Sequence, residues 1–359
     1  MDSGGVAAER GLRHGRRKRI KAAMTMADET KSRDRGLDGK LVVLIGGSGF
    51  VGAHLAQELL GRAARLRIVS RRPERAFRLR PLSNLGQVQF VRGDATRPES
   101  LIPALAGAHA AVHLAGAFTG DLDALHGHGA GRVAALARQG GAQAFLYFSA
   151  LGADASSPID YSRSKAEGEA AVRAAFPSAT VLRPSVLFGP DDHFVNLFAG
   201  LIGRLPAVPV FAPDAQFQPL NVDDAAQAAA NALADQRRHG GETYEIAGPE
   251  PISMLELHRR IAAAQGRERL FIALPDAVSR AIAAATGWLP GAPLSSEQWA
   301  LLKRGNVLAG PNGLAALGVT PRPLALFLDR WMVRYRKNGR FGVNLPAPGR
   351  VWQSTSLRR

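Results

Sequence analysis

Cysteine is absent from this chain of 359 residues. Without it the protein has no disulfide framework, no thiolate metal site and no cysteine nucleophile, which is typical of a reducing compartment. No uninterrupted apolar stretch approaches the roughly 18 to 20 residues that a membrane-spanning helix needs. The most apolar region, FIALPDAVSRAIAAATGWLPGAPL from Phe271, is interrupted by Asp276, Arg280 and several prolines. We therefore interpret it as protein core or as a surface that faces a partner.

Acidic residues are scarce, and the excess of positive charge is unevenly distributed. The chain has 46 lysine and arginine residues against 30 acids, a net charge of +16. Residues 1–40 hold eleven basic and six acidic residues, and residues 331–359 hold seven basic residues and no acid, so the two ends supply twelve of the sixteen charges. The remainder, +4, argues against a nucleic-acid-binding domain. The basic ends are suited to anionic lipid headgroups or to an acidic partner surface, unless they are simply solvated.

Short apolar runs alternate with helix-compatible stretches from Leu41 onward. Six runs recur every 22 to 36 residues, at residues 41–46, 66–70, 88–93, 110–116, 144–149 and 180–185. Apolar strands that alternate with helices are typical of a parallel sheet covered by helices on both faces. The sequence thus predicts an α/β fold with a doubly wound parallel sheet of the Rossmann type, followed by a smaller C-terminal α/β lobe.

The same pattern suggests where the domains begin and end. Residues 1–39 lack hydrophobic periodicity and the apolar segment of a secretory signal, so we expect a disordered basic extension there and a basic tail over residues 341–359. We expect a nucleotide-binding domain over residues 40–190, to which residues 217–238 return. Outside these ranges, strands and helices no longer alternate regularly. Residues 191–216 and 239–340 are therefore expected to form the smaller lobe, which closes over the carboxyl edge of the sheet.

The stretch LVVLIGGSGFVGAHLAQELL, from Leu41, contains the strongest motif. It matches G-x-x-G-x-x-G through Gly46, Gly49 and Gly52, directly after a predicted strand and at the start of an amphipathic helix. Such glycines allow a tight turn, close approach of the backbone to a pyrophosphate and close packing of helix on strand. The first helical turn, with Phe50 and Val51, then presents its amides to the phosphates. The motif predicts dinucleotide binding; the alternative is a glycine turn that serves packing alone.

The end of the second predicted strand indicates which dinucleotide is bound. An NAD site has an acidic residue there to accept the ribose 2′-hydroxyl, but this position reads RIVSRRPER, with Ser70, Arg71 and Arg72. A guanidinium binds a 2′-phosphate through paired hydrogen bonds. We therefore expect NADP(H), unless these arginines are ordinary surface charge. Asp94 and Ala95, after the third predicted strand, are in position to contact the adenine, although an exposed loop aspartate is an equal alternative.

Tyr161 and Lys165 follow the fifth predicted strand and lie four residues apart, hence on one face if the segment is helical. A neighbouring ammonium favours the phenolate and lets a tyrosine exchange protons below its usual pKa of about 10. The lysine is also suited to hold the nicotinamide ribose. This pair predicts a site of reductase origin.

Several stretches resemble one family, the short-chain dehydrogenase/reductases of the extended or atypical kind. They are GGSGFVG from Gly46, YSRSK from Tyr161, LRPSVLFGP at residues 182–190 and QPLNVDDAAQA at residues 218–228. The resemblance covers about Leu41 to Leu326. It implies that Pro184 and Ser185 lie beside the nicotinamide, and that Ala115 and Gly116 line the cofactor cleft.

A closer resemblance is to the NADPH-binding accessory subunits of respiratory complex I, of the ninth alpha-subcomplex type, and to their bacterial relatives. Residues 161–201 and the segment RPLALFLDRWMVRYRKNGRF from Arg322 carry it. It implies a subunit that holds NADP(H), contacts core subunits on the peripheral arm of complex I and lies on the cytoplasmic or matrix side of the membrane. Trp331, Met332 and Tyr335, which stand between basic residues, would then face protein or lipid headgroups. The alternative is a helix that packs on its own lobe.

The substrate-activating part of the motif departs from the family. Active extended members usually carry a serine or threonine one or two residues after the serine that ends the fifth strand, and here these positions are Ala150 and Leu151. Ser149 remains a candidate donor, and His126 takes the place of an asparagine that supports a proton relay in many members. Loss of an oxyanion donor typically costs about 10²–10³ in rate. We therefore expect an accessory subunit with little or no catalysis. The alternative is an active NADP(H)-dependent reductase, epimerase or dehydratase acting on a small carbonyl, quinone-precursor or sugar-nucleotide substrate.

The acidic stretch DDHFVNLF, at residues 191–198, is not expected to bind a metal. Hard cations need more converging oxygens than one turn between a strand and a helix supplies. We expect Asp191 and Asp192 to act as acids at a helix N-terminus instead, where they favour the helix dipole. The sequence predicts no metal site.

Overall fold

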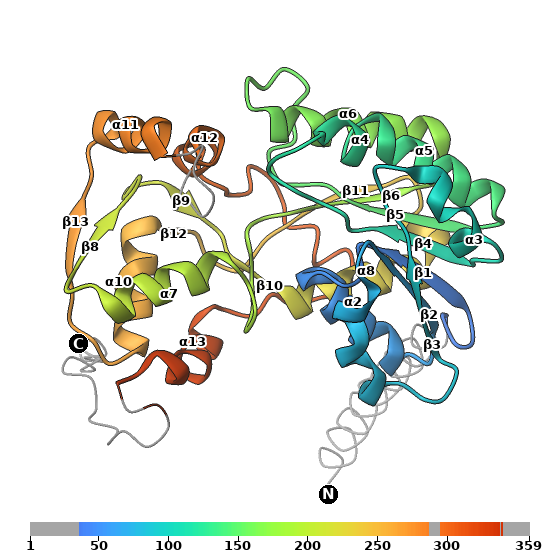
Figure 1. Cartoon of the computed structure of the whole chain (residues 1–359), viewed down its shortest axis with the longest axis horizontal. Coiled ribbons are helices and arrows are strands. Elements are labelled where there is room, and N and C mark those ends of the chain that lie inside the picture. The colour runs from blue at the N-terminus through green and yellow to red at the C-terminus, as the bar shows by residue number, and fades with distance from the viewer. Residues whose placement is uncertain (1–35, 287–294, 338, 340–359) are drawn as a thin grey trace, which may run out of the picture.

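Seven parallel strands form one sheet at the centre of the protein (Figure 1). The computed structural model describes residues 36–286, 295–337 and 339. The strand order is β11-β6-β5-β4-β1-β2-β3. The strands are β1 (Leu41–Ile45), β2 (Arg65–Ser70), β3 (Val88–Arg92), β4 (Ala110–His113), β5 (Ala144–Phe148), β6 (Thr180–Pro184) and β11 (Thr243–Ile246). All six strands expected from the sequence are present and parallel, which confirms the doubly wound fold.

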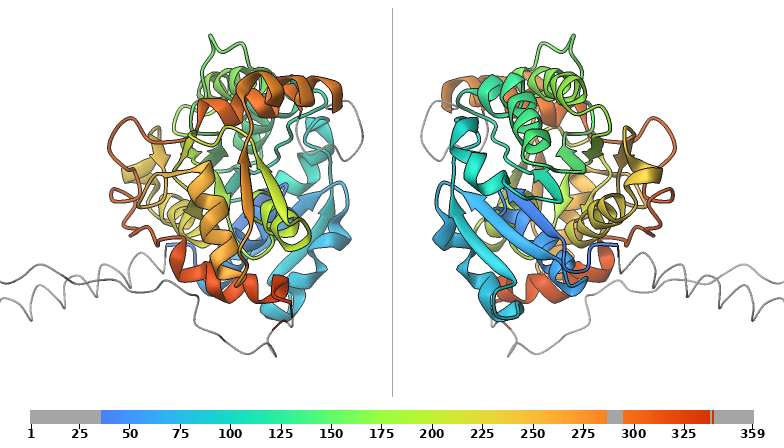
Figure 2. Two further views of the ribbon diagram at one scale, coloured as in Figure 1. Left: turned by 90° about the vertical axis from the view of Figure 1, so that its left-hand side faces the viewer. Right: turned by 90° about the vertical axis from the view of Figure 1, so that its right-hand side faces the viewer.

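Helices cover both faces of this sheet, as Figures 1 and 2 show. The long ones are α2 (Phe50–Gly61), α5 (His128–Gln139), α6 (Asp160–Ala175) and α8 (Val222–Ala234). α2 packs against α8 on one face, and α5 packs against α6 on the other. The side chain of Leu44 lies in the first core and that of its neighbour Val43 lies in the second. Because alternate residues of a central strand are buried on opposite faces, the strand reads as a continuous apolar run.

Short helical segments replace full helices in several connections. They are η1 (Pro73–Leu82), η2 (Pro98–Leu101), α3 (Ile102–Leu105), α4 (Leu122–Leu125) and α9 (Gln236–His239). η1 is a 3-10 helix that begins at Pro73 and contains Pro81 near its end. Pro81 has no amide hydrogen to donate, so a regular α-helix could not continue through it without losing a hydrogen bond.

A smaller lobe lies beside the carboxyl ends of the strands, on the left in Figure 1. Its elements are α7 (Phe194–Arg204), β8 (Ala207–Val210), β9 (Gln216–Phe217), β12 (Ile252–Ser253), α10 (Met254–Ala264), β13 (Leu270–Ala273), α11 (Asp276–Thr286), α12 (Ser296–Arg304), α13 (Ala325–Trp331) and η3 (Met332–Tyr335). The short strands β7 (Leu187–Phe188) and β10 (Leu220–Asn221) pair with each other where the two lobes meet, with Leu220 in the core of the main sheet and Phe188 in that of the smaller lobe. Phe188, Ile202 and Leu257 belong to its own apolar core. Within the described residues, no helix is long and apolar enough to cross a bilayer.

Two later segments return to the main sheet, contrary to the boundaries expected from the sequence. The assignment of residues 239–340 to the smaller lobe is wrong for β11, which pairs in parallel with β6 and forms an edge of the sheet. It is also wrong for Leu314, Leu317 and Val319, which are buried in the same core as α2 and α8. The return expected at residue 217 begins slightly later, because Phe217 is buried in the core of the smaller lobe. A strand or loop that arrives late in the chain has no local signal for the sheet it joins.

The segment that contains α13 and η3 packs on its own lobe. Met332 is fully buried in the small-lobe core, and Trp331 and Tyr335 pack against that core. The Tyr335 hydroxyl also donates to Asn196 Oδ1 at 3.0 Å. Met332 therefore cannot face a partner or lipid, whereas Trp331 and Tyr335 are partly exposed and their contact with a partner or lipid stays a prediction. The basic tail expected over residues 341–359, and most of the extension expected over residues 1–39, lie outside the described residues.

The acids of the DDHF stretch act at the junction between the lobes. Asp192, which directly precedes the N-cap residue His193, accepts a hydrogen bond at Oδ1 from Val195 N at 2.6 Å in the first turn of α7, so the expected role at a helix N-terminus is confirmed for Asp192 and not for Asp191. Asp191 accepts from His54 Nε2 at 3.1 Å, and the other ring nitrogen of His54 lies 2.6 Å from Asp223 Oδ1. Burial alone would lower the pKa of His54, but its hydrogen bonds to Asp223 and Asp191 outweigh burial and raise that pKa above 6.5.

His54→Gln is expected to destabilise the protein by about 1 kcal/mol at about pH 6 and by less at about pH 9. A histidine whose pKa is raised by folding contributes stability that is complete below its unfolded pKa and is lost as the pH rises through its folded pKa. Urea unfolding of both proteins at the two pH values measures the difference. Equal destabilisation at both pH values would contradict a charged His54 between the two carboxylates.

Candidate dinucleotide-binding site

A pocket of about 1040 Å³ opens beside the carboxyl ends of β1, β2, β3 and β4. β1 has β2 on one side and β4 on the other, so the connections that follow β1 and β4 lead to opposite faces of the sheet. This is the point in an open α/β sheet where a crevice forms and ligands bind. The residues predicted to hold the cofactor that line this pocket are Gly46, Gly49, Phe50, Val51, Gly52, Ser70, Arg71, Arg72, Asp94, Ala95, Ala115 and Gly116.

The glycine turn leaves the N-terminus of α2 open to the pocket. Gly46 has a φ of +83°, and a Cβ there would lie 2.8 Å from the backbone nitrogen of Ala115. A Cβ on Gly52 would lie 2.5 Å from the Cα of Gly47, so the helix packs directly on the turn. Gly49 is the N-cap of α2, where no side chain caps the helix and the first turn holds no acid. The first amides of α2 and the positive end of its dipole are therefore available to a phosphate.

Gly52→Ala is expected to destabilise the protein by about 2 kcal/mol and to abolish dinucleotide binding, because its Cβ must push α2 away from the backbone of Gly47. Gly61→Ala, in the last turn of the same helix, is the matched control. A Cβ at Gly61 meets nothing within 4 Å, so this change should be neutral or stabilising. Thermal unfolding and binding of NADPH, followed by its fluorescence, measure both effects. Full binding by Gly52→Ala would show that the close approach is not needed.

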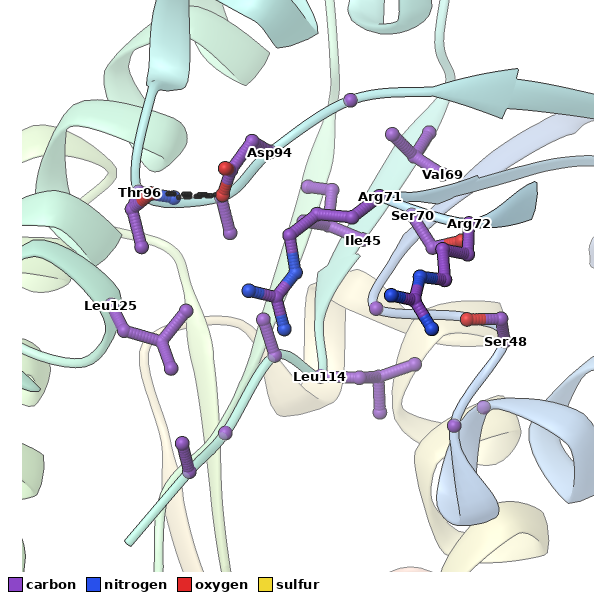
Figure 3. Close-up of a pocket in the computed structure, with 18 of the residues that line it drawn as sticks. Ile45, Ser48, Val69, Ser70, Arg71, Arg72, Asp94, Thr96, Leu114 and Leu125 are labelled. Carbon is purple, nitrogen blue, oxygen red and sulfur yellow. Dashed lines mark hydrogen bonds between the residues drawn. The ribbon is translucent and has the colours of Figure 1, made fainter. Parts of the chain in front are cut away.

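Arginine side chains surround the part of the pocket at the end of β2 (Figure 3). The Arg72 guanidinium points toward the Ser48 hydroxyl, and Arg71 extends across the pocket. The Ser70 hydroxyl is buried and has no hydrogen-bond partner among the described residues. Arg75 also lines the pocket. An unpaired hydroxyl beside guanidinium groups fits a ligand that brings phosphate oxygens, because buried polar groups otherwise find partners.

Asp94 and Ala95 lie in the loop after β3, on the opposite wall of the pocket. Asp94 Oδ1 accepts hydrogen bonds from Thr96 N at 3.0 Å and from Thr96 Oγ1 at 2.9 Å. One carboxylate oxygen therefore stabilises the turn of its own loop. Ala95 is buried and lines the pocket. Contact with an adenine stays a prediction for both residues.

Tyr161 and Lys165 lie on α6 outside the lining of this pocket. The Lys165 side chain is buried, and its Nζ donates to the carbonyl oxygen of Phe148 at 2.8 Å. The Tyr161 ring packs against Phe118, with the ring centroids 4.7 Å apart. Burial raises the pKa of Tyr161 to about 12 and lowers the pKa of Lys165 to about 7. The expectation that the lysine would bring the tyrosine pKa below 10 is therefore wrong, because burial opposes both charges.

The hydroxyl of Ser149 is committed to a buried carboxylate. Ser149 Oγ donates to Glu169 Oε1 at 2.5 Å, and both residues are less than a tenth exposed. Arg183 holds the same carboxylate with two hydrogen bonds, from Nε at 2.8 Å and from NH2 at 2.7 Å. An ionised carboxylate only accepts hydrogen bonds, so the Ser149 proton points at Glu169. Ser149 therefore does not direct its proton toward a substrate carbonyl in this structure.

His126 is held by the fold through both ring nitrogens. Its Nε2 accepts from Ala117 N at 3.1 Å, so Nδ1 carries the hydrogen and donates to Ser164 Oγ at 3.2 Å. The Ser164 hydroxyl in turn donates to the carbonyl of Tyr161. Burial, strengthened by the charge of Lys165, lowers the pKa of His126 to about 2. His126 is thus a neutral residue that fixes α6 beside the loop after β4.

Pro184 and Ser185 were expected beside the nicotinamide. Pro184 ends β6 and Ser185 follows it, and neither residue lines the pocket. The Ser185 hydroxyl is buried and donates to the carbonyl of Gln218 at 2.6 Å. The Pro184 carbonyl accepts from Leu151 N at 2.9 Å, and Asn306 Nδ2 donates to the Leu151 carbonyl at 3.3 Å. The loop that carries the missing donor position is therefore fixed by β6 and by the segment after α12.

Four residues of these sites were missed in the sequence. Ser48 lies within the glycine motif and lines the pocket, and Arg75 stands three residues after Arg72, where the eclipsed side chains of a 3-10 helix meet. Arg92 ends β3 directly opposite Ser70 and also lines the pocket. Glu169 stands four residues after Lys165 on the same helix face, so its spacing was a usable signal.

Comparison with known proteins agrees with this geometry. Residues 42–247 match the model of the NAD dependent epimerase/dehydratase family. The chain is 29% identical over 322 residues to NADH dehydrogenase (ubiquinone) 1 alpha subcomplex subunit 9, mitochondrial, of Arabidopsis thaliana, which covers 84% of this chain and 80% of the plant protein. It is 34% identical over 191 residues to ceramide reductase of Caulobacter vibrioides, which covers 52% of this chain and 58% of that protein.

A solved structure has the same fold. Triphenylmethane reductase from Citrobacter sp., complexed with NADP(H), superposes with a TM-score of 0.65 and 21% sequence identity, over 80% of this chain and 97% of that chain. At this identity the likeness concerns the fold, and the chemistry must be argued from the residues of this chain.

Proposed function

This chain belongs to the NAD dependent epimerase/dehydratase family, and from that premise we propose that it holds NADP(H) tightly, with little or no turnover, as an accessory subunit of respiratory complex I. Its family membership, which was predicted from the sequence, makes it a nicotinamide-dinucleotide-binding protein of the short-chain dehydrogenase type. The finer proposal concerns the choice of NADP(H), the loss of catalysis and the partner.

The hydrogen bond from Ser149 to Glu169 carries the proposal of lost catalysis. Reduction of a carbonyl needs a donor aimed at the oxygen on which negative charge develops, and a preorganised donor contributes about 10²–10³ in rate. Ser149 is committed to Glu169, and Ala150 and Leu151 offer no side-chain donor. Burial raises the pKa of Tyr161 to about 12, so its phenol is a weaker acid and gives its proton to a substrate oxygen less readily. Tyr161 and Lys165 then serve as contacts to the nicotinamide ribose.

The arginines of the pocket support NADP(H) over NAD(H). Arg72, Ser70 and Ser48 converge where the ribose 2′-position of a dinucleotide lies in this fold, after β2. A carboxylate at this point would repel a 2′-phosphate, and none follows β2 until Glu74. Bound cofactor supplies hydride chemistry only where a substrate is activated. In this chain the cofactor would chiefly stabilise the fold, because it bridges the glycine turn and the walls after β2, β3 and β4.

A second function is favoured by the presence of Tyr161 and Lys165, four residues apart on α6. In this reading the chain is an NADP(H)-dependent reductase of a carbonyl compound, in keeping with its similarity to a ceramide reductase. Ser149 would have to turn from Glu169 toward the substrate. NADPH oxidation with long-chain and short-chain ketones, abolished by Tyr161→Phe, would support the reductase. Bound NADPH that is stable with every ketone, in wild type and in Tyr161→Phe alike, would support the subunit.

The partner and the location follow from the similarity to the complex I subunit. We expect docking on core subunits of the peripheral arm, on the cytoplasmic or matrix side of the membrane. The test is to isolate C-terminally tagged protein from gently solubilised native membranes. Near-stoichiometric recovery of complex I core subunits would support the proposal. Recovery as a single soluble protein with bound NADP(H) would overturn it and would favour the reductase.

A further inference from the structure

The end of the sheet opposite the pocket combines basic side chains with exposed leucines. Because all seven strands are parallel, their amino ends lie together on the side away from the cofactor pocket. The loop over residues 83–87, between η1 and β3, belongs to this end. It is fixed there because Leu66 N donates to the Gln87 carbonyl at 2.8 Å and Gln87 Nε2 donates to the Ala64 carbonyl at 2.9 Å.

Two leucines at this end, Leu82 at the end of η1 and Leu85 in the loop, are exposed without an evident role in the fold. Leu85 is fully exposed, and Leu82 is 51% exposed. The neighbouring Arg80 places its guanidinium 3.8 Å from the ring centroid of Phe77, which is itself 39% exposed. An arginine held over an aromatic ring beside protruding leucines presents charge and apolar surface at one tip. Exposed apolar groups that are grouped in this way mark an interaction site.

The charge around this tip is positive. Lys40 precedes β1, Arg65 begins β2 and Arg80 ends the last turn of η1. Arg62 and Glu58 form an ion pair near this end. The other charged side chains described at the amino ends of the strands are mostly basic. The basic ones are Lys40, Arg65, Arg80, Arg138, Arg173, Arg237 and Arg238, and the acidic ones are Asp38, Asp235 and Glu242. We call the surface formed by Lys40, Arg65, Arg80, Leu82 and Leu85 the basic edge. One exposed carboxylate, Asp38, lies two residues before Lys40, so the three basic side chains outnumber it.

The N-terminal segment joins the fold at the same end. A Cβ on Gly36 would lie 2.8 Å from the Ala234 carbonyl, and Gly39 N donates to the Ala63 carbonyl at 3.0 Å, directly before β2. Residues 1–35 contain ten basic and five acidic residues. Gly36 and Gly39 therefore lie at the end of the sheet that carries the basic edge.

We propose that the basic edge binds the surface of a bilayer that contains anionic lipids. Leucines on a projecting loop can enter the boundary between headgroups and acyl chains, while arginine stems lie along it and their guanidinium groups reach the phosphates. An acidic protein would satisfy the arginines but would need a pocket for Leu85, whereas a bilayer needs none. The pocket opens at the other end of the strands, so NADP(H) exchanges with the aqueous phase in the bound state. This inference is independent of docking on complex I.

Sedimentation of the full-length protein with vesicles tests the proposal. The vesicles are phosphatidylcholine alone, or phosphatidylcholine with about one-third phosphatidylglycerol. We expect binding to the anionic vesicles only, and weaker binding at high salt. The double change Leu82→Ser and Leu85→Ser should lower the partition coefficient about tenfold. The double change Arg65→Gln and Arg80→Gln should lower it about fivefold per charge.

Matched variants on the smaller lobe separate this surface from general effects. Leu326→Ser, at a leucine that is 65% exposed on α13, and Arg259→Gln, at an exposed arginine on α10, should bind vesicles as the wild type does. All variants should keep wild-type NADPH affinity, which shows that they are folded. No sedimentation of the wild type would overturn the proposal. Unchanged sedimentation of both double variants would also overturn it, and would assign the binding to the basic chain ends.

Discussion

The double change Arg71→Ser and Arg72→Ser is expected to weaken NADPH binding about a hundredfold, because the pocket loses two guanidinium groups that attract the phosphates and, at Arg72, the charge-assisted hydrogen bonds to a 2′-phosphate. NADH has no 2′-phosphate, so its affinity should fall much less. The two side chains point in different directions in Figure 3, which separates their roles. Arg72, beside Ser48 and Ser70, should account for most of the selectivity. Arg71 extends across the pocket, so its loss should weaken both dinucleotides.

Titration calorimetry with NADPH and NADH measures these affinities for the double variant and for each single variant. Arg97→Ser is the control, because Arg97 is exposed in the same region but does not line the pocket. Its affinities should equal those of the wild type. An equal loss for NADPH and NADH in Arg72→Ser would show that Arg72 contributes general attraction and does not select the phosphate.

Arg183→Met is expected to lower the free energy of unfolding by about 3 kcal/mol. It leaves the Glu169 carboxylate, which is 6% exposed, without the guanidinium that holds both of its oxygens. A buried charge that loses its partner is much more destabilising than a replaced pair. The combination of Glu169→Met with Arg183→Met should therefore recover most of the loss. Urea unfolding of the wild type, both single variants and the double variant completes the cycle.

An exposed ion pair on α6, the helix that carries Glu169, provides the comparison. Arg163 pairs with Asp160 at the start of α6, and these side chains are 39% and 57% exposed. Arg163→Met should change the free energy of unfolding by no more than about 0.5 kcal/mol. If Arg183→Met had an effect as small as this, or if the losses in the cycle simply added, the Glu169 network would not be the buried pair described above.

The central sheet could be predicted because each inner strand has a local signature. Residues 110–113 and 144–148 are buried throughout, and such strands read as unbroken apolar runs. β11 could not be predicted in the same way. Three of its four residues are only partly buried, and Glu245 is one of them. Nothing in the sequence between residues 243 and 246 indicates that this segment pairs with β6, some sixty residues earlier.

In the candidate site, too, the residues that act through local geometry could be predicted, and those that act through tertiary contacts could not. Gly46, Gly52 and Arg72 act through local geometry, so their spacing in the sequence was enough to predict that they lie in one pocket. The ionisation of Tyr161 depends on burial and on packing against Phe118, which comes from a different loop. The direction of the Ser149 hydroxyl depends on Glu169, a residue of the following helix. Such contacts between residues from different elements follow from tertiary packing, and the residues that make them have no fixed spacing in the sequence.

The late return of β11 and of Leu314, Leu317 and Val319 to the main sheet has a consequence during synthesis on the ribosome. The nascent chain has made six of the seven strands by residue 184, but the edge of β6 stays open until residue 246 has emerged. The core beneath α2 and α8 stays incomplete until residue 319 has emerged. An unpaired strand edge and an uncovered apolar face promote association between chains. We therefore expect association between nascent chains to be most favoured while residues 185–319 are being made.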